Sequence, residues 1–321
     1  MTSLVEWIWN RPAQPASMAN PEAWWAWQQK VRDQLEGTVA RAVAGGYGAD
    51  RPAYAFASGY QEALRALLGP QTMALGLGGD IVALTATEAT GNHPRDIRTE
   101  LSTTPNGLRL SGEKSWAMLG PAANRFLVVA TEGLGADGKS QLRALLVPTR
   151  RAGVHTPAPD KPSPVVPEIP HTRAIFEEVE VAPEEVLPGD GYAHYLKPFR
   201  TLEDLHVHAA LLGWLLQVLR RVEAPQDLCE RFLSSLLAAV ELGSMDARHP
   251  ATHVALAGFL TQGYGLVEEA GPHFERTDEA TQARWTRDRA LLHIARRARE
   301  RRREVAWSQA PSGAFGPKSP N

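Results

Sequence analysis

The sequence predicts an α+β protein, with an N-terminal helical block, a β-sandwich-like middle domain and a C-terminal helical bundle. Residues 21–68 carry large apolar side chains at helical spacing, which indicates packed helices. Residues 81–191 break into short strand-like segments bounded by turn residues, which indicates a small β domain. Beyond Gly191, leucines recur every three or four residues, which is the pattern of buried bundle helices.

The chain divides where these patterns change. Its 321 residues exceed the usual size of one domain. We expect the helical block over residues 1–78, the β domain over 79–191 and the helical bundle over 192–307. Residues 308–321 are rich in proline and glycine, and predict a disordered tail.

Composition excludes several classes of partner. A formal net charge of −2 gives no overall attraction to nucleic acid or to an anionic membrane. No apolar run approaches the length of a membrane span. The only cysteine, Cys229, excludes an intramolecular disulfide and fits a reducing compartment. We therefore expect a cytoplasmic protein without nucleic-acid or membrane partners.

The helical block has a recognisable end. Residues 1–20 are rich in Trp and Pro and predict an irregular lead-in. Residues 54–68 predict one continuous helix, which Gly69 then terminates together with the proline that follows. Three tryptophans lie in the preceding helical sequence and are interpreted as packing anchors: Trp24, Trp25 and Trp27.

Turn chemistry organises the middle domain. Asn106-Gly107 is a strong signal for a hairpin turn. Six prolines within residues 155–171 indicate an extended surface loop. The strand candidates are short apolar or alternating runs: residues 81–87, 126–130, 144–147 and 175–181.

The C-terminal bundle opens with a regular apolar stripe, formed by Leu202, Leu205, Ala209, Leu212, Leu216 and Leu219. Two or three further helices are predicted to follow, the last from about Trp285. The arginine-rich residues 296–303 have two interpretations. They form either a solvated face near a helix C-terminus or a contact with a phosphate-bearing partner.

Three motifs resemble functional sites but lack the context that those sites need. Residues 133–138 have the glycine spacing of a dinucleotide-binding loop, but a predicted strand follows instead of a helix. Residues 111–114 have the serine–lysine spacing of penicillin-type acylases, but lie between strands. Glu203 and His206 match half of a di-iron motif whose second half is missing, so no metal is expected.

Four phrases follow one another through the β domain: Thr87-Glu88, Gly112-Glu113-Lys114-Ser115-Trp116, Leu146-Val147-Pro148 and residues 176–181. In this order they resemble the middle domain of flavin-dependent acyl-CoA dehydrogenases, and the resemblance covers roughly residues 54–216. It implies FAD as the cofactor and an acyl thioester as the substrate. It also implies a homodimer or homotetramer assembled through the C-terminal bundle.

The resemblance implies a set of cofactor-binding residues, namely Thr87, Glu88, Gly91, Asn92, Trp116 and Met118. Asn92 stands where the family has serine, and its amide can still donate a hydrogen bond to a phosphate. Trp116 would lie against the flavin ring. Met118 stands where the family's threonine hydrogen-bonds near N5, and a thioether cannot donate that bond.

The resemblance implies Glu203 as the catalytic base. Most of the family carries the base in a Tyr-Glu-Gly phrase near the C-terminus, where this chain has Ala295-Arg296-Arg297. A minority carries it on an earlier helix, ten residues before a glycine, and Glu203 stands ten residues before Gly213.

The surroundings of Glu203 allow two interpretations. Ala210 and Gly213 share its helix stripe with His206, and their small side chains would leave room for a flat ring or a thioester. Asp204, a neighbouring like charge, would raise the pKa of Glu203. Alternatively, Glu203 is an acid in the first turn of a helix, stabilised there by the helix dipole.

Three functions are consistent with these residues. The first is a flavin-dependent oxidoreductase that removes an α-proton and a β-hydride from an acyl thioester, with Glu203 as base. The second is a non-catalytic or regulatory relative, indicated by Met118 and the replaced C-terminal base. The third is a flavin monooxygenase on the same scaffold, whose chemistry does not need that base.

Overall fold

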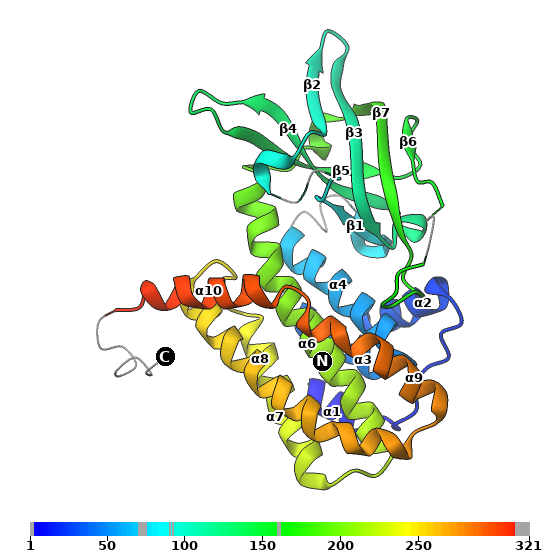
Figure 1. Cartoon of the computed structure of the whole chain (residues 1–321). Helices are drawn as coiled ribbons and strands as arrows, with labels where there is room; N and C mark the ends of the chain where they lie inside the picture. The colour runs from blue at the N-terminus through cyan, green and yellow to red at the C-terminus, as the bar shows by residue number, and fades with distance from the viewer. Residues whose placement is uncertain (1–2, 70–75, 90, 92, 159–161, 312–321) are drawn as a thin grey trace.

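A sheet and a group of helices meet along one junction. The computed structural model describes residues 3–69, 76–89, 91, 93–158 and 162–311. Figure 1 shows the strands gathered at one end, with α4 and α6 reaching up to them and the other helices packed below. This arrangement confirms the predicted α+β fold, with the β domain between two helical segments of the chain.

The N-terminal helices are α1 (Leu4–Trp9), α2 (Pro21–Arg32), α3 (Thr38–Tyr47) and α4 (Pro52–Leu68). The prediction of an irregular lead-in was wrong for α1, because Ser3 and Glu6 form a capping box that stabilises this short helix. Trp24 is fully buried, stacks on Tyr54 and donates a 2.9 Å hydrogen bond to Ser58. Its role as a packing anchor is confirmed.

Among the described residues of the β domain, seven strands form one curled sheet, in the order β1-β4-β2-β3-β7-β6 with β5 paired to β4. The strands are β1 (Val82–Thr85), β2 (Glu100–Thr104), β3 (Gly107–Met118), β4 (Arg125–Leu134), β5 (Ser140–Pro148), β6 (Val154–His155) and β7 (His171–Val181). Thr104 pairs with Gly107 across the predicted hairpin turn, and residues 133–138 lie where β4 turns into β5. The hairpin and the glycine-rich turn are therefore confirmed.

The C-terminal helices are α6 (Lys197–Arg221), α7 (Gln226–Leu242), α8 (Pro250–Ala270), α9 (Glu279–Asp288) and α10 (Arg296–Ser308). The apolar stripe of α6 is buried from Leu205 to Leu219, as predicted. Trp285 lies within α9, so the last helix begins later than predicted. Ala295, with φ 63, places a left-handed turn immediately before α10.

Glycines bring α3, α4 and α6 into backbone contact. A Cβ on Gly46 of α3 would lie 2.0 Å from the Ala210 carbonyl oxygen of α6. A Cβ on Gly59 of α4 would lie 2.6 Å from the Val207 Cα, and one on Gly213 would lie 2.5 Å from the Val43 carbonyl oxygen. The three helices therefore form one tightly packed unit beneath the sheet.

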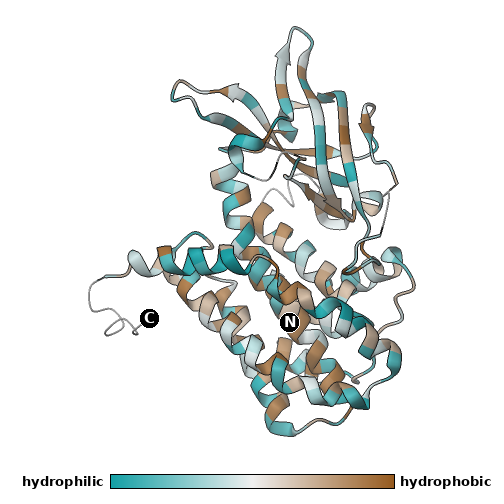
Figure 2. Ribbon diagram, in the orientation of Figure 1, coloured by the Kyte–Doolittle hydropathy of each residue, from teal (hydrophilic) through white to brown (hydrophobic). Residues whose placement is uncertain are grey.

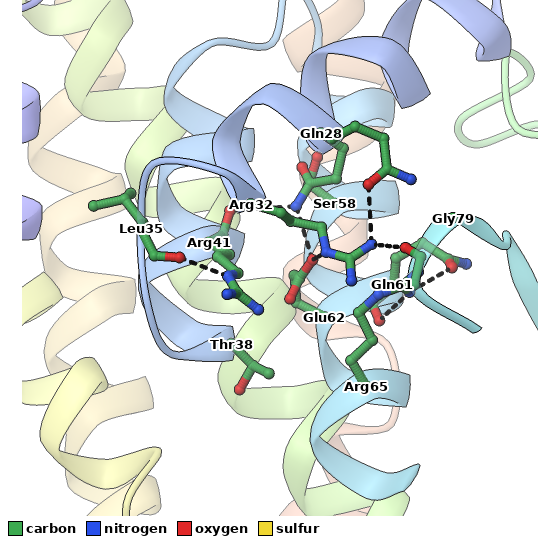
Figure 3. Close-up of polar contacts among 12 residues, drawn as sticks. Gln28, Arg32, Leu35, Thr38, Arg41, Ser58, Gln61, Glu62, Arg65 and Gly79 are labelled. Carbon is green, nitrogen blue, oxygen red and sulfur yellow. Dashed lines mark hydrogen bonds and ion pairs between the residues drawn. The ribbon is translucent and has the colours of Figure 1, made fainter. Parts of the chain in front are cut away.

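A buried polar network ties α4 to the start of β1. Figure 3 shows Arg32, Gln61, Glu62 and Arg65 gathered beside the turn at residues 77–79. Arg65 donates to the Asp80 carbonyl at 2.7 Å. The Gln61 amide donates to the Val82 carbonyl at 2.7 Å and accepts from the Val82 N–H at 3.1 Å. These bonds fix β1, and the residues that follow it, against α4.

The apolar core runs without interruption from the N-terminal helices through the sheet into α6 and the later helices. In Figure 2, which colours each residue by its hydropathy, α10 is largely hydrophilic. Within the described ranges, no helix combines the length and apolarity needed to cross a bilayer.

Candidate functional site

A cavity of about 220 Å³ lies where the sheet meets α4 and α6. The sheet side contributes residues from the end of β1, from β3 and from β7, and the helix side contributes residues from α4 and from the start of α6. The lining residues are Tyr60, Leu84, Ala86, Thr87, Trp116, Met118, His171, Leu196, Phe199, Arg200 and Glu203.

The cavity unites four of the residues singled out from the sequence. Thr87, Trp116 and Met118 line its sheet side, and Glu203 lines its helix side. Thr87 is held directly against β3, because its carbonyl accepts a 2.8 Å hydrogen bond from the Ser115 N–H. Asn92 lies outside the described residues.

Trp116 presents an open aromatic face beside this cavity. Its side chain is 55% exposed, which is high for an indole. The β3–β7 pairing skips Trp116, passing from Ser115 opposite Arg173 to Ala117 opposite Thr172. Such a bulge re-aims a side chain away from the ladder. The indole is therefore free to stack against a flat ligand.

Glu88 and Gly91 are not among the residues that line the cavity. The Glu88 carboxylate accepts hydrogen bonds from Lys114 Nζ at 2.7 Å, from the Thr99 N–H at 2.9 Å and from the Arg98 N–H at 2.8 Å. Burial acts to raise the pKa of Glu88, but these donors outweigh burial and hold the pKa below its usual range. We interpret Glu88 as a residue that fastens the loop after β1 to β3.

Glu203 carries an unpaired carboxylate at the beginning of α6. Its side chain is partly buried, and no hydrogen bond or ion pair joins it to another residue of the described ranges. The pKa of Glu203 is raised to about 7, chiefly by burial and then by the negative charge of Asp204, against the opposing charges of Arg299 and Arg200. The sequence correctly indicated the effect of Asp204, although burial is the larger cause.

Asp204 forms ion pairs with two arginines of α10. Arg299 Nε donates to one Asp204 oxygen at 2.7 Å, and Arg302 binds the other. Part of the arginine-rich stretch therefore makes partly buried ion pairs with α6. The prediction of a uniformly solvated arginine face was wrong for these two residues.

The small residues of α6 do not border the cavity, so the prediction that Ala210 and Gly213 leave room for a ligand was wrong. Both face α3, where they allow the backbones to touch. His206 is buried beside them, with Nδ1 2.7 Å from the Leu202 carbonyl oxygen and Nε2 2.9 Å from Thr38 Oγ1. Among the described residues, no group of three potential metal ligands is found.

Sequence reasoning missed three polar residues of the cavity. The Tyr60 hydroxyl oxygen accepts a 2.8 Å hydrogen bond from the Leu84 N–H, so its own hydrogen remains to be donated. Burial lowers the pKa of His171, whose Nδ1 lies 2.8 Å from the Ile169 carbonyl oxygen. Arg200 is exposed at the helix side. None of the three stands in a motif, because only the junction of sheet and helices brings them together.

No family model matches this chain, and no curated protein matches it. Several solved structures do match this chain. Butyryl-CoA dehydrogenase from Megasphaera elsdenii is 15% identical, with 90% of each chain covered and a TM-score of 0.70. FMN-bound TdsC from Paenibacillus sp. A11-2 is 17% identical, with 92% of this chain and 93% of that chain covered and a TM-score of 0.71. PigA with FAD and proline is 15% identical, with 92% and 90% covered and a TM-score of 0.64. At these identities the comparisons show a shared fold.

Proposed function

Since the chain has the fold of acyl-CoA dehydrogenases, we propose that it is a flavin-dependent oxidoreductase and that its cavity at the sheet–helix junction is the active site. The observation that carries this proposal is the meeting of Thr87, Trp116, Met118 and Glu203 around one cavity. They come from three distant parts of the chain, namely the end of β1, the end of β3 and the beginning of α6.

The lining fits the ring of a flavin. An open indole, a thioether and several apolar side chains provide a surface for a flat aromatic group, and Thr87 adds a polar edge. Trp116, Met118 and Thr87 would hold the cofactor. The cavity is smaller than the roughly 300–1,000 Å³ of typical ligand sites, so we expect a ring bound against Trp116 to extend beyond the cavity mouth. FAD is the proposed form of the cofactor, as in the structure of PigA with FAD.

Glu203 is the proposed base. A bound flavin would supply a hydride acceptor, while the Glu203 carboxylate takes the proton from the carbon next to the thioester carbonyl. A carboxyl group with a pKa of about 7 is partly ionised at neutral pH and is a stronger base than an ordinary glutamate. The absence of a hydrogen-bonding partner within the described residues leaves this carboxylate available to a substrate.

A flavin monooxygenase is the second candidate, and the compactness of the cavity favours it. With a flavin ring against Trp116, the space that remains in a cavity of about 220 Å³ suits a small ring better than an extended thioester. TdsC, one of the structures with the same fold, has been solved with FMN and indole. Oxygen-dependent product from an externally reduced flavin would distinguish this reaction from dehydrogenation.

The first test is reconstitution with FAD and FMN, followed by an anaerobic reaction with butyryl-CoA. We expect a yellow protein whose flavin absorbance bleaches, and at least about 100-fold slower bleaching in Glu203→Gln. Glu230→Gln is the matched control, because Glu230 is exposed on α7 and away from the cavity. A protein that stays colourless in excess FAD and FMN would instead support a non-catalytic relative. Equal bleaching by Glu203→Gln would reject Glu203 as the base.

A further inference from the structure

His171 lines the cavity, and the role of one of its ring nitrogens is fixed by a backbone contact. Its Nδ1 lies 2.8 Å from the Ile169 carbonyl oxygen, and a carbonyl oxygen can only accept a hydrogen bond. Nδ1 must therefore carry the hydrogen. In the neutral ring this leaves Nε2 without a hydrogen and with a free lone pair. Burial lowers the pKa of His171, which favours this neutral form at neutral pH.

Nε2 of His171 has no partner among the residues that the structure describes. The two buried histidines of α6 differ in this respect. His206 uses its second nitrogen on Thr38, and His208 has its own second nitrogen 3.3 Å from the Leu292 carbonyl oxygen. His171 is thus a cavity-lining histidine with an acceptor that the protein itself leaves unused.

The position of His171 places that acceptor beside the proposed ligand surface. His171 is the first residue of β7 and pairs directly with Met118 of β3. Glu203, the proposed base, lies on the opposite side, on α6. Figure 1 shows β3 and β7 above the junction and α6 below it. A ligand in the cavity would therefore meet an acceptor from each side.

We propose that His171 is a second ligand-binding residue of this cavity, and that its Nε2 accepts a hydrogen bond from an N–H or O–H group on the edge of the bound ligand. The inference rests on the proposed function, because the ligand is then the flavin or a substrate held beside it. A flavin ring and an indole-like substrate of the second candidate function offer the same chemistry, a planar group with an N–H on its edge. Met118 cannot take this part, since a thioether is only a weak acceptor.

Chemical modification of the wild-type protein tests the inference without altering the fold. Diethyl pyrocarbonate acylates an unprotonated imidazole nitrogen, and mass spectrometry locates the modified residue. We expect His171 to react in the free protein, and FAD to protect it. His155 is exposed on β6 and should react with or without FAD, whereas His206 should not react.

Two outcomes of this experiment would overturn the inference. If His171 does not react in the free protein, its Nε2 does not face the cavity. The second outcome is that FAD binds and yet leaves His171 reactive, both by itself and in the presence of indole. In that case Nε2 of His171 does not contact a ligand. Protection that requires indole would assign the contact to the substrate, and protection by FAD alone would assign it to the cofactor. Failure of FAD and FMN to bind would instead reject the proposed function, and with it a flavin as the partner of His171.

Substitutions measure the strength of the contact. His171→Gln keeps an acceptor oxygen, and we expect FAD affinity close to that of the wild type. His171→Leu removes the acceptor, and we expect roughly 3- to 10-fold weaker FAD binding, the usual effect of one lost hydrogen bond. His155→Leu is the control and should bind FAD normally. Equal FAD affinities for His171→Leu and the wild type would exclude the flavin as the hydrogen-bond donor. Protection of His171 by FAD together with indole would then be required, and its absence would overturn the inference.

Discussion

At the scale of single residues, Glu203 is expected to lower the stability of the protein above neutral pH. Its pKa is raised from an ordinary value of 4.5 to about 7 in the folded protein. The folded state therefore holds a proton that the unfolded state releases, and stability falls as pH rises from about 4.5 to about 7. Glu203→Gln removes this loss. We expect up to about 3 kcal/mol of added stability at pH 8 in urea unfolding, less where solvent screens the charge, and no change at pH 4.

The control for this experiment is Glu230→Gln, which removes an exposed carboxylate and should leave stability unchanged at both pH values. A Glu203→Gln protein no more stable than the wild type at pH 8 would show that Glu203 ionises normally. Such a result would support the alternative interpretation, in which Glu203 is an ordinary acid in the first turn of a helix.

Where a motif carried the information, the sequence indicated residues that the fold brings to one cavity. Trp116 and Met118 lie in a recognisable phrase on one strand, and both line the cavity. The spacing to Gly213 indicated Glu203, which lines the cavity, but the glycine itself packs against α3 and not against the cavity. Spacing along a helix fixes which residues share a face, but not which neighbour that face meets. His171 belongs to no phrase, and its role depends on pairing with Met118.

At the scale of elements, the packing of α3 on α6 depends on Gly46. A Cβ there would lie 2.0 Å from the Ala210 carbonyl oxygen, a distance that forces the two backbones apart. We expect Gly46→Ala to destabilise the protein by about 1–3 kcal/mol in urea unfolding. Because Glu203 stands about two turns before Ala210 on α6, the displacement should also weaken FAD binding.

Gly258→Ala is the matched control. Gly258 lies in α8 and is exposed, and a Cβ there meets nothing within 4 Å. The same substitution should therefore stabilise the protein by roughly 0.5–1 kcal/mol, through the helix preference of alanine over glycine. If both variants lost similar stability, the close approach of α3 and α6 would not be the cause.

Element boundaries were harder to predict than element types. The sequence indicated the hairpin at Asn106-Gly107 and the buried face of α6, because turn chemistry and apolar periodicity are local. The bonds of Arg299 to Asp204 are not local. They join α10 to α6 across a long stretch of chain, so an arginine run alone could not show which of its members face inward.

At the scale of the whole molecule, the order of the segments largely determines where the site lies. The chain leaves α4, passes through the sheet and returns to α6, and the two helices pack side by side beneath the strands. The junction between the layers therefore collects residues from both ends of the β domain. The order of helical and strand-like segments was predictable from sequence, because period and composition change at each border. The depth of the cavity was not, because it depends on how side chains of separate layers fit.

A ligand held at this junction should stabilise the whole molecule, since it binds only when both layers are assembled. At a free FAD concentration one hundred times its Kd, the expected gain is about 2.7 kcal/mol. For a chain of this length, that gain corresponds to a rise in Tm of about 4 °C in calorimetry. Trp116→Ala should abolish most of the rise, because the open indole forms part of the proposed ring-binding surface.

Trp9→Ala tests whether any exposed tryptophan has the same effect. Trp9 is 79% exposed at the end of α1 and does not line the cavity. This variant should keep the full FAD-dependent rise in Tm. If Trp116→Ala kept the full rise as well, FAD would be binding at another surface. The meeting of sheet and helices would then be a feature of the fold without a role in cofactor binding.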